Sequence, residues 1–140
     1  MDQKIREAIF REVAREPFAL TLGMELKELE AGFSAVEMDY NPETMNNLFA
    51  RAHGGAIFSL IDEAFETVCQ TVGEVTVALN VNVNYVASPE AGTRLRAEAR
   101  EVNGTRRTAS YDIRVCDGEG RLLAICQALA YRTGKPLPFL

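Results

Sequence analysis

Two features in the middle of the chain combine residue types that could do chemistry. His53, Gly54 and Gly55 stand where a loop enters a predicted helix, and Asp62 lies eight residues further on. The first amides of a helix have no partner inside it and lie at its positive end, so they favour an oxyanion or a polarised carbonyl. Glycine also lets a ligand approach them closely. Asp62 stands among apolar residues, where partial burial and the like charge of Glu66 would oppose its ionisation, so it is a candidate base or nucleophile.

Each feature also has a purely structural interpretation. Two glycines can simply let the chain turn into a helix. Asp62 can belong to a solvated polar stripe, because five residues fall on one line of the helix at spacings of three or four: Gly55, Ser59, Asp62, Glu66 and Cys69.

The spacing of the two features constrains how they could act together. Eight residues of helix separate Gly54 from Asp62 by about 12 Å. A backbone donor and an attacking group must each come within roughly 3 Å of the reacting centre. One ester carbonyl can therefore contact both only if they come from two chains, as in a two-fold dimer with antiparallel central helices.

Other catalytic and metal-binding templates are missing from the chain. One histidine excludes an HExxH motif or a histidine metal triad, and no P-loop, GxGxxG or GxSxG sequence occurs. Cys69, Cys116 and Cys126 are widely spaced and predict small core residues rather than disulfides or a zinc site. We expect no metal and no redox cofactor.

Composition indicates an ordinary globule. The 140 residues are 47% hydrophobic and 25% charged with a net charge of −5, which suits one domain over residues 1–140. A nucleic-acid partner is not expected because the balance is not basic. No apolar run is long enough to span a membrane, and the N-terminus lacks the pattern of a signal peptide, so we expect a cytoplasmic protein.

Hydrophobic periodicity predicts an α+β fold with an antiparallel sheet wrapped over one long helix. The expected helices span residues 2–16, ended by Pro17, and 55–70. Two strands joined at Ala31-Gly32 are expected within residues 20–40, followed by a loop to residue 53. Four consecutive strands are expected at 75–85, with one face on the core, and at 94–102, 106–116 and 121–132, joined by turns at Asn103-Gly104 and 117–120.

Several of these residues together carry a resemblance. The relevant positions are Asn47, the His53-Gly54-Gly55 triplet, Asp62 in SLIDEAFE and a long strand that ends at Ser88-Pro89. In this combination they resemble the hotdog-fold acyl-CoA thioesterases of the phenylacetic-acid-degradation type. The similarity covers roughly residues 20–133. It implies a hotdog fold with an extra N-terminal helix, and a homodimer or dimer of dimers with composite sites.

The resemblance also implies roles for individual residues. Asp62 would be the nucleophile or the general base, Gly54 N–H would polarise the thioester carbonyl, and His53 and Asn47 would position substrate, water or the neighbouring loop. The acyl tail would lie against an apolar group at the start of the helix. That group consists of Gly55, Leu48, Phe49, Phe58 and Phe65.

Three positions depart from the family pattern. Glu66 stands one turn after Asp62 where small or hydroxyl residues are more usual, and Ala78 replaces a serine that some members carry. A Gly-Lys/Arg pair is replaced by Thr105-Arg106 with Arg107 following. These arginines could bind the phosphates of coenzyme A, with Ser88 as a further contact and coenzyme A entering only as part of the substrate.

Three alternatives remain, of which the first is a purely structural role that would place Asp62 towards open solvent. A hotdog hydratase carries D-x-N-P followed by a histidine, which Asp39 to Pro42 imitate, but Thr44 occupies the place of that histidine. A non-catalytic acyl-CoA-binding module or sensor would use the same pocket without turnover, although binding alone does not need a carboxylate such as Asp62 near the thioester.

Overall fold

The computed structural model describes residues 1–140 and contains six strands and four α-helices. The helices are α1 (Gln3–Val13), α2 (Pro17–Leu22), α3 (Pro42–Met45) and α4 (Gly54–Cys69), and the 3₁₀ turn η1 (Gln70–Val72) follows α4. The strands are β1 (Glu25–Glu30), β2 (Phe33–Asp39), β3 (Glu74–Tyr85), β4 (Arg94–Gly104), β5 (Thr108–Cys116) and β6 (Leu122–Pro136).

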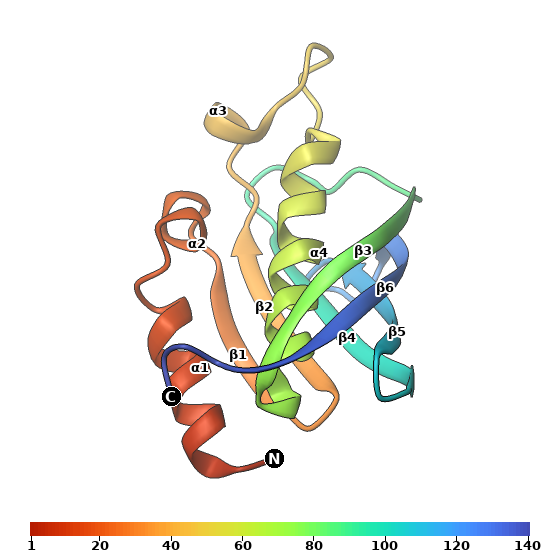
Figure 1. The fold of residues 1–140 in the computed structure, drawn as a ribbon. Coiled ribbons are helices and arrows are strands. Elements are labelled where there is room, and N and C mark those ends of the chain that lie inside the picture. Colours follow the sequence, from red (N-terminus) through yellow and green to blue (C-terminus); the bar gives the residue numbers. More distant parts are fainter.

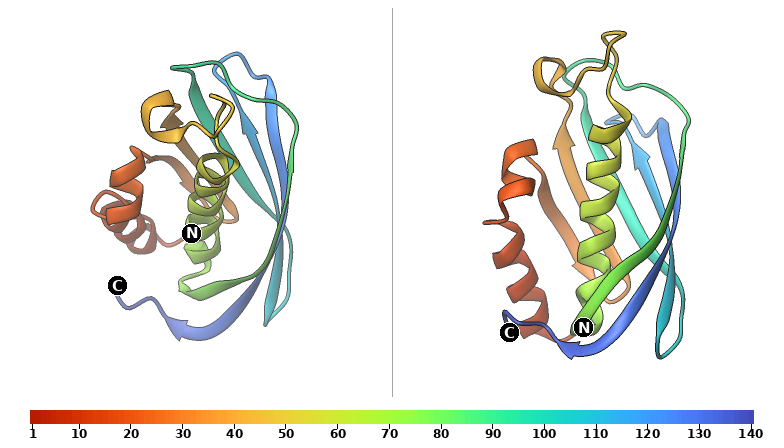
Figure 2. Two further views of the ribbon diagram at one scale, coloured as in Figure 1. Left: turned by 90° about the horizontal axis from the view of Figure 1, so that it is seen from above. Right: turned by 45° about the horizontal axis from the view of Figure 1, so that its top comes forward.

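All six strands form one antiparallel sheet in the order β1-β2-β4-β5-β6-β3. The sheet curls around α4, which lies along its concave side (Figure 1). Seen from above, α1 and α2 flank α4 on the side away from β3, β5 and β6 (Figure 2). The predicted α+β architecture, with one long helix inside an antiparallel sheet and a further N-terminal helix, is confirmed. No helix is both long and apolar enough to cross a bilayer.

The core forms between α4 and the sheet. The apolar face predicted for this helix is buried throughout, and it consists of Ile57, Leu60, Ile61, Ala64, Phe65 and Val68. Phe65 packs edge-on against Tyr111 of β5, with ring centroids 5.3 Å apart. Burial of each such side chain stabilises the fold by about 1.5–3 kcal/mol, so α4 is fixed firmly in the sheet and its remaining face is placed with the same precision.

The N-terminal segment differs from the prediction in one element. Helix α1 ends at Val13, three residues before the predicted end, and Pro17 does not end it. Pro17 instead occupies the first turn of α2, where its fixed φ and missing N–H suit a helix start. Residues 20–22 are therefore helical rather than extended. The first strand begins only at Glu25, after Gly23 closes α2 with φ +67°. The turn at Ala31-Gly32 is confirmed.

The hairpin between β4 and β5 turns later than Asn103-Gly104, which was the predicted position. A bulge between Glu101 and Asn103 shifts the register, and both Asn103 and Gly104 still pair within the strand. The turn lies at residues 105–107, because the Thr105 hydroxyl accepts hydrogen bonds from the N–H groups of Arg107 and Thr108.

Strand β3 is one of the two edge strands of the sheet, the other being β1, and it pairs only with β6. The prediction that one of its faces lies on the core is wrong for the middle of the strand, where a bulge between Ala78 and Asn80 interrupts the alternation. Val77 is 45% and Leu79 57% exposed. A long edge with free backbone groups and exposed apolar side chains is a template for pairing with another strand.

Candidate active site

His53 closes the N-terminus of α4 with its own side chain. Its backbone is extended, with φ −65° and ψ 135°, and its Nδ1 accepts a hydrogen bond of 2.9 Å from the N–H of Gly55. An imidazole that accepts at Nδ1 is neutral and carries its proton on Nε2, so the exposed edge of the ring offers a donor. The sequence analysis found His53 but not this capping role.

The capping bond leaves the amide of Gly54 free. Gly54 N–H has no hydrogen-bond partner within the chain, whereas the next amide is held by His53. The His53–Gly54 peptide that carries this N–H is held by its own carbonyl, which accepts from the N–H groups of Ala56 and Ile57. The hydroxyl of Tyr85 donates to the carbonyl oxygen of the next peptide, that of Gly54, at 3.1 Å. A Cβ added at Gly54 would lie 3.2 Å from the Tyr85 ring. Of the two glycine amides, that of Gly54 is therefore the available donor, and that of Gly55 is bound by the His53 cap.

Sequence reasoning missed Tyr85 as a site residue. It closes strand β3, 31 residues after Gly54, and only the tertiary fold brings the ring onto the helix start. The signal available in the sequence was an aromatic residue at the end of the long strand that follows the helix.

Asn47 shapes the loop in front of α4. Its side-chain oxygen accepts from the N–H groups of Phe49 and Arg51, at 2.8 and 3.2 Å, and so holds a tight loop tip. The tip carries Leu48, 98% exposed, and Phe49, 82% exposed. The loop predicted for residues 41–53 thus contains the short helix α3 and a closed tip that projects beyond the body of the chain (Figure 1).

Asp62 lies on the face of α4 that the chain leaves uncovered. Its side chain is exposed in the single chain, as is that of Glu66 one turn later. Surrounding protein atoms nevertheless desolvate Asp62 in part and raise its pKa above the usual value. In Glu66 the same cause leads, with the charges of Glu16 and Asp62 adding to it. Both carboxyl groups therefore bind a proton more readily than a fully solvated carboxyl group does.

The predicted apolar contacts for an acyl group divide into two kinds. Phe58 is half-buried on α4 and stands near the helix start, as do Leu48 and Phe49. Phe65 is only 2% exposed and belongs to the core beside Tyr111, so it offers no surface to a ligand.

The three residues predicted to bind coenzyme A lie at opposite ends of the chain's fold. Arg106 and Arg107 are exposed in the β4–β5 hairpin, where Arg107 donates to the hydroxyl of Tyr131 at 2.8 Å. That hairpin adjoins the part of β6 that pairs with the start of β3, near the C-terminal end of α4. Ser88 follows the end of β3, near the N-terminal end of α4. The structure therefore does not bring these three residues together within one chain.

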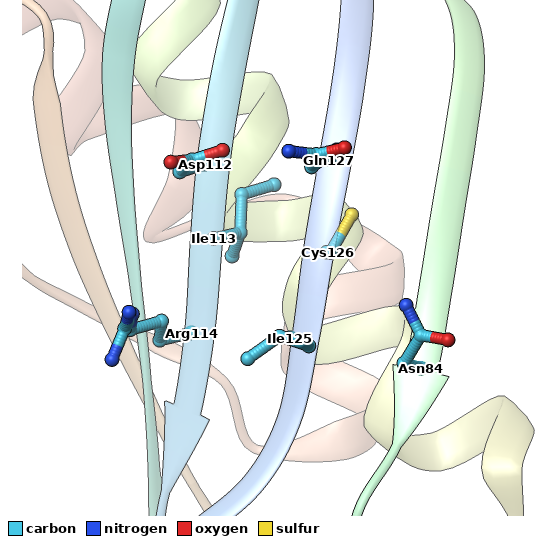
Figure 3. Close-up of a pocket in the computed structure, with 7 residues that line it drawn as sticks. All are labelled: Asn84, Asp112, Ile113, Arg114, Ile125, Cys126 and Gln127. Atoms are coloured by element: carbon cyan, nitrogen blue, oxygen red, sulfur yellow. The ribbon is translucent and has the colours of Figure 1, made fainter.

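A hollow on the sheet is separate from these residues. It measures about 330 Å³ and is lined by Asn84, Asp112, Ile113, Arg114, Ile125, Cys126 and Gln127. Figure 3 shows these side chains along β3, β5 and β6, with α4 behind the sheet. Neither Gly54 nor Asp62 borders it, so it is not the candidate active site.

One helix enclosed by a six-stranded antiparallel sheet, with a free amide at its start and a carboxylate on its open face, defines a hotdog-fold protein. The chain belongs to the thioesterase superfamily, whose model matches residues 49–124, more than half of its length. Within that family it is of the PaaI-like type, as the similarities below show.

The most informative relatives are bacterial and archaeal. A putative esterase of Archaeoglobus fulgidus is 33% identical over 84% of this chain and 75% of its own length. The acyl-coenzyme A thioesterase PaaI of Escherichia coli is 28% identical over 83% of this chain and 82% of its own. The solved structure of E. coli PaaI superposes with a TM-score of 0.89 over 95% of this chain and 96% of that one, at 26% identity. A Streptococcus mutans structure bound to acetyl-CoA gives a TM-score of 0.76 at 27% identity, over 81% and 91%.

Proposed function

We propose that this protein hydrolyses acyl-CoA thioesters to a free acid and coenzyme A. The proposal draws on the acyl-CoA thioesterase among its relatives and on the acetyl-CoA bound in a similar structure. An acyl group of aromatic or medium-chain type suits the apolar side chains near the start of α4, namely Leu48, Phe49 and Phe58.

The observation that carries the proposal is the unpartnered N–H of Gly54. It lies at the positive end of a sixteen-residue helix; the His53 carbonyl of its own peptide accepts two helix hydrogen bonds, and Tyr85 bonds the carbonyl of the next peptide. A donor held this way favours the charge that develops on a thioester oxygen during attack, an effect worth about 3 kcal/mol of barrier.

The second chemical group of the proposed site is Asp62 of a partner chain. Asp62 lies about 12 Å from Gly54 along one helix, too far for one carbonyl to contact both. Two copies that pair their free β3 edges in antiparallel fashion would also set their α4 helices antiparallel. If the two-fold axis passes about level with residue 58, midway between Gly54 and Asp62, then Gly54 at the start of each α4 faces Asp62 of the other chain. A homodimer, or a dimer of such dimers, then holds two equivalent sites in each pair.

The chemistry proposed for Asp62 takes one of two forms. As a general base, its carboxylate removes a proton from the attacking water. As a nucleophile, it attacks the carbonyl itself and water then cleaves the resulting anhydride. In both, the oxyanion is held by Gly54 N–H of the other chain, and the thiolate of coenzyme A leaves and is protonated. Arg106 and Arg107 are the proposed partners of the coenzyme A phosphates.

The experiment follows free thiol released from phenylacetyl-CoA and from a panel of medium-chain acyl-CoAs. We expect turnover by the wild-type protein and a loss of more than about 100-fold in Asp62→Asn, because the amide cannot act as base or nucleophile. Asp112→Asn, the same change on the outer face of the sheet, is the matched control and retains activity. Tight acyl-CoA binding without thiol release would identify a sensor and contradict the proposed hydrolysis.

A further inference from the structure

Three glutamates converge beside α4, apart from the helix start. Glu16 precedes α2, while Glu63 and Glu66 lie on α4. One carboxylate oxygen from each lies within 4.8 Å of the other two. This carboxylate cluster joins segments that are 47 residues apart in the sequence, and the sequence analysis noted only Glu66.

Glu63 is the unusual member of the carboxylate cluster. It is 3% exposed, and its enclosed Oε1 has no hydrogen-bond partner. Buried carboxyl oxygens are nearly always satisfied, because an unpaired one forfeits its hydration without replacement. Since an oxygen of Glu63 lies within 4.8 Å of oxygens from Glu16 and Glu66, this buried acid is directed into the cluster.

The carboxylate cluster lacks a compensating cation within the protein. None of its members forms an ion pair or accepts a side-chain hydrogen bond. The neighbouring Glu12, by contrast, pairs with Arg11 and Arg15. Burial, and then the charges of its acidic neighbours, raise the pKa of Glu63 to about 8. The carboxylate cluster thus lacks arginine partners such as those that pair with Glu12, Glu37 and Glu101.

A hollow of about 230 Å³ opens next to the carboxylate cluster. Glu16 and Glu66 border it together with Glu12, and Phe139 of the C-terminal tail covers another side. Such a space provides both an entry path and room for water molecules that complete a coordination sphere.

We propose that Glu16, Glu63 and Glu66 form a binding site for a hard divalent cation of the calcium type. Carboxylate oxygens are the ligands that such ions prefer. Oxygens on opposite sides of a Ca²⁺ ion lie about 4.6–5.2 Å apart, so three oxygens within 4.8 Å of one another fit its coordination sphere. The ion takes the buried Glu63 carboxylate as a ligand and offsets two of the three negative charges of the cluster.

The bound ion would act as a structural link. It ties the residue before α2 to the middle of α4, and so fixes the N-terminal helices on the side of the central helix. Because it binds the folded chain and not the unfolded one, it raises the melting temperature. We expect a rise of about 4 °C when free Ca²⁺ reaches ten times its Kd.

The test is calorimetric titration of the full-length protein, freed of metal with a chelator and dialysed, using CaCl₂ as the probe at constant ionic strength. The expected result is saturable binding of one Ca²⁺ per chain with the stated rise in melting temperature. Glu63→Gln should abolish saturable binding. Glu12→Gln, the same change at the edge of the same hollow, should bind Ca²⁺ as the wild type does.

Glu16→Gln is the second variant, because residue 16 lies outside the core and its change does not threaten folding. It should weaken Ca²⁺ binding at least about 10-fold through the loss of one charged ligand. The proposal would be overturned if the wild type showed no saturable binding, or if Glu63→Gln and Glu16→Gln bound Ca²⁺ as tightly as the wild type does. Glu63 would then be a buried, protonated carboxyl group.

Discussion

Asp62 and Glu63 are adjacent in the sequence yet meet opposite environments on α4. Asp62 lies on the open face of the helix, exposed to solvent in the single chain. Glu63, turned by about 100° around the helix, is 3% exposed and faces Glu16. The pKa of each is raised by burial, but only that of Glu63 reaches about 8. The comparison teaches that position around the helix, rather than residue type, separates a carboxylate available to substrate from one enclosed in the fold.

The largest effect on kcat is expected for Gly54, which lies at the opposite end of the proposed site from Asp62. Gly54→Pro removes the free N–H while keeping a residue that suits the first turn of a helix. It should lower kcat about 100- to 1000-fold, the usual effect of removing an oxyanion donor. Gly54→Ala keeps the N–H and, like Gly54→Pro, places a Cβ against the Tyr85 ring. It should therefore lower kcat far less than Gly54→Pro does. Equal losses in the two variants would show that crowding, and not the amide, matters.

The pH dependence of hydrolysis sharpens the role of Asp62. The proposed reaction needs the carboxylate, and the pKa of Asp62 is raised by desolvation. Activity should therefore fall on acidification, about 10-fold per pH unit below that pKa, and the decline should begin at a higher pH than an ordinary aspartate would give. A profile of kcat/KM against pH in the wild type checks this. An acid limb at the ordinary aspartate value would contradict the assigned environment.

Stability should respond more to Glu63 than to Asp62. The pKa of Glu63 is raised on folding from 4.5 to about 8, so its stabilising protonation is complete below pH 4.5 and is lost as the pH rises towards 8. With a chelator present, the free energy of unfolding should fall by about 1.4 kcal/mol per pH unit in that window. Glu63→Gln should flatten this slope in urea denaturation at several pH values. Asp62→Asn should flatten it much less, because the charge of Asp62 is the smallest of the causes that raise the pKa of Glu63, and an equal flattening there would reverse the comparison.

The smallest effect is expected for Tyr85→Phe. The change removes the hydrogen bond to the Gly54 carbonyl but keeps the ring that covers the helix start. Loss of one such bond is worth about 1 kcal/mol, so we expect a decrease of several-fold in kcat with little change in KM. A loss as large as that of Gly54→Pro would mean that the Tyr85 hydroxyl takes part in the chemistry itself.

The fold followed closely from local patterns where those patterns were unambiguous. The alternation between Val75 and Tyr85 predicted strand β3, and the apolar spacing from Ile57 to Val68 predicted α4. The errors arose where one residue can act in two ways. Pro17 can end one helix or start another, and here it starts α2 while α1 ends earlier, at Val13. Asn103-Gly104 lies inside a strand because a bulge displaces the turn.

The candidate site was only partly predictable for a different reason. Gly54 and Asp62 lie on one helix and carry a recognisable spacing, so the sequence could identify them. The Tyr85 hydroxyl and the Glu16 carboxylate reach their partners from distant segments, at sequence separations of 31 and 47 residues. Such contacts depend on how the sheet and the N-terminal helices pack on α4, and the hydrophobic periodicity of the sequence does not specify that packing.

The two-chain site is tested most directly by mixing two inactive variants. Asp62→Asn and Gly54→Pro are unfolded together in equal amounts and refolded, and heterodimers are verified by mass after differential tagging. Random pairing makes half of the dimers heterodimers, and each regains one intact site of two, so the mixture should recover about one quarter of wild-type activity. Heterodimers that form and remain inactive would contradict a site built from Gly54 of one chain and Asp62 of the other.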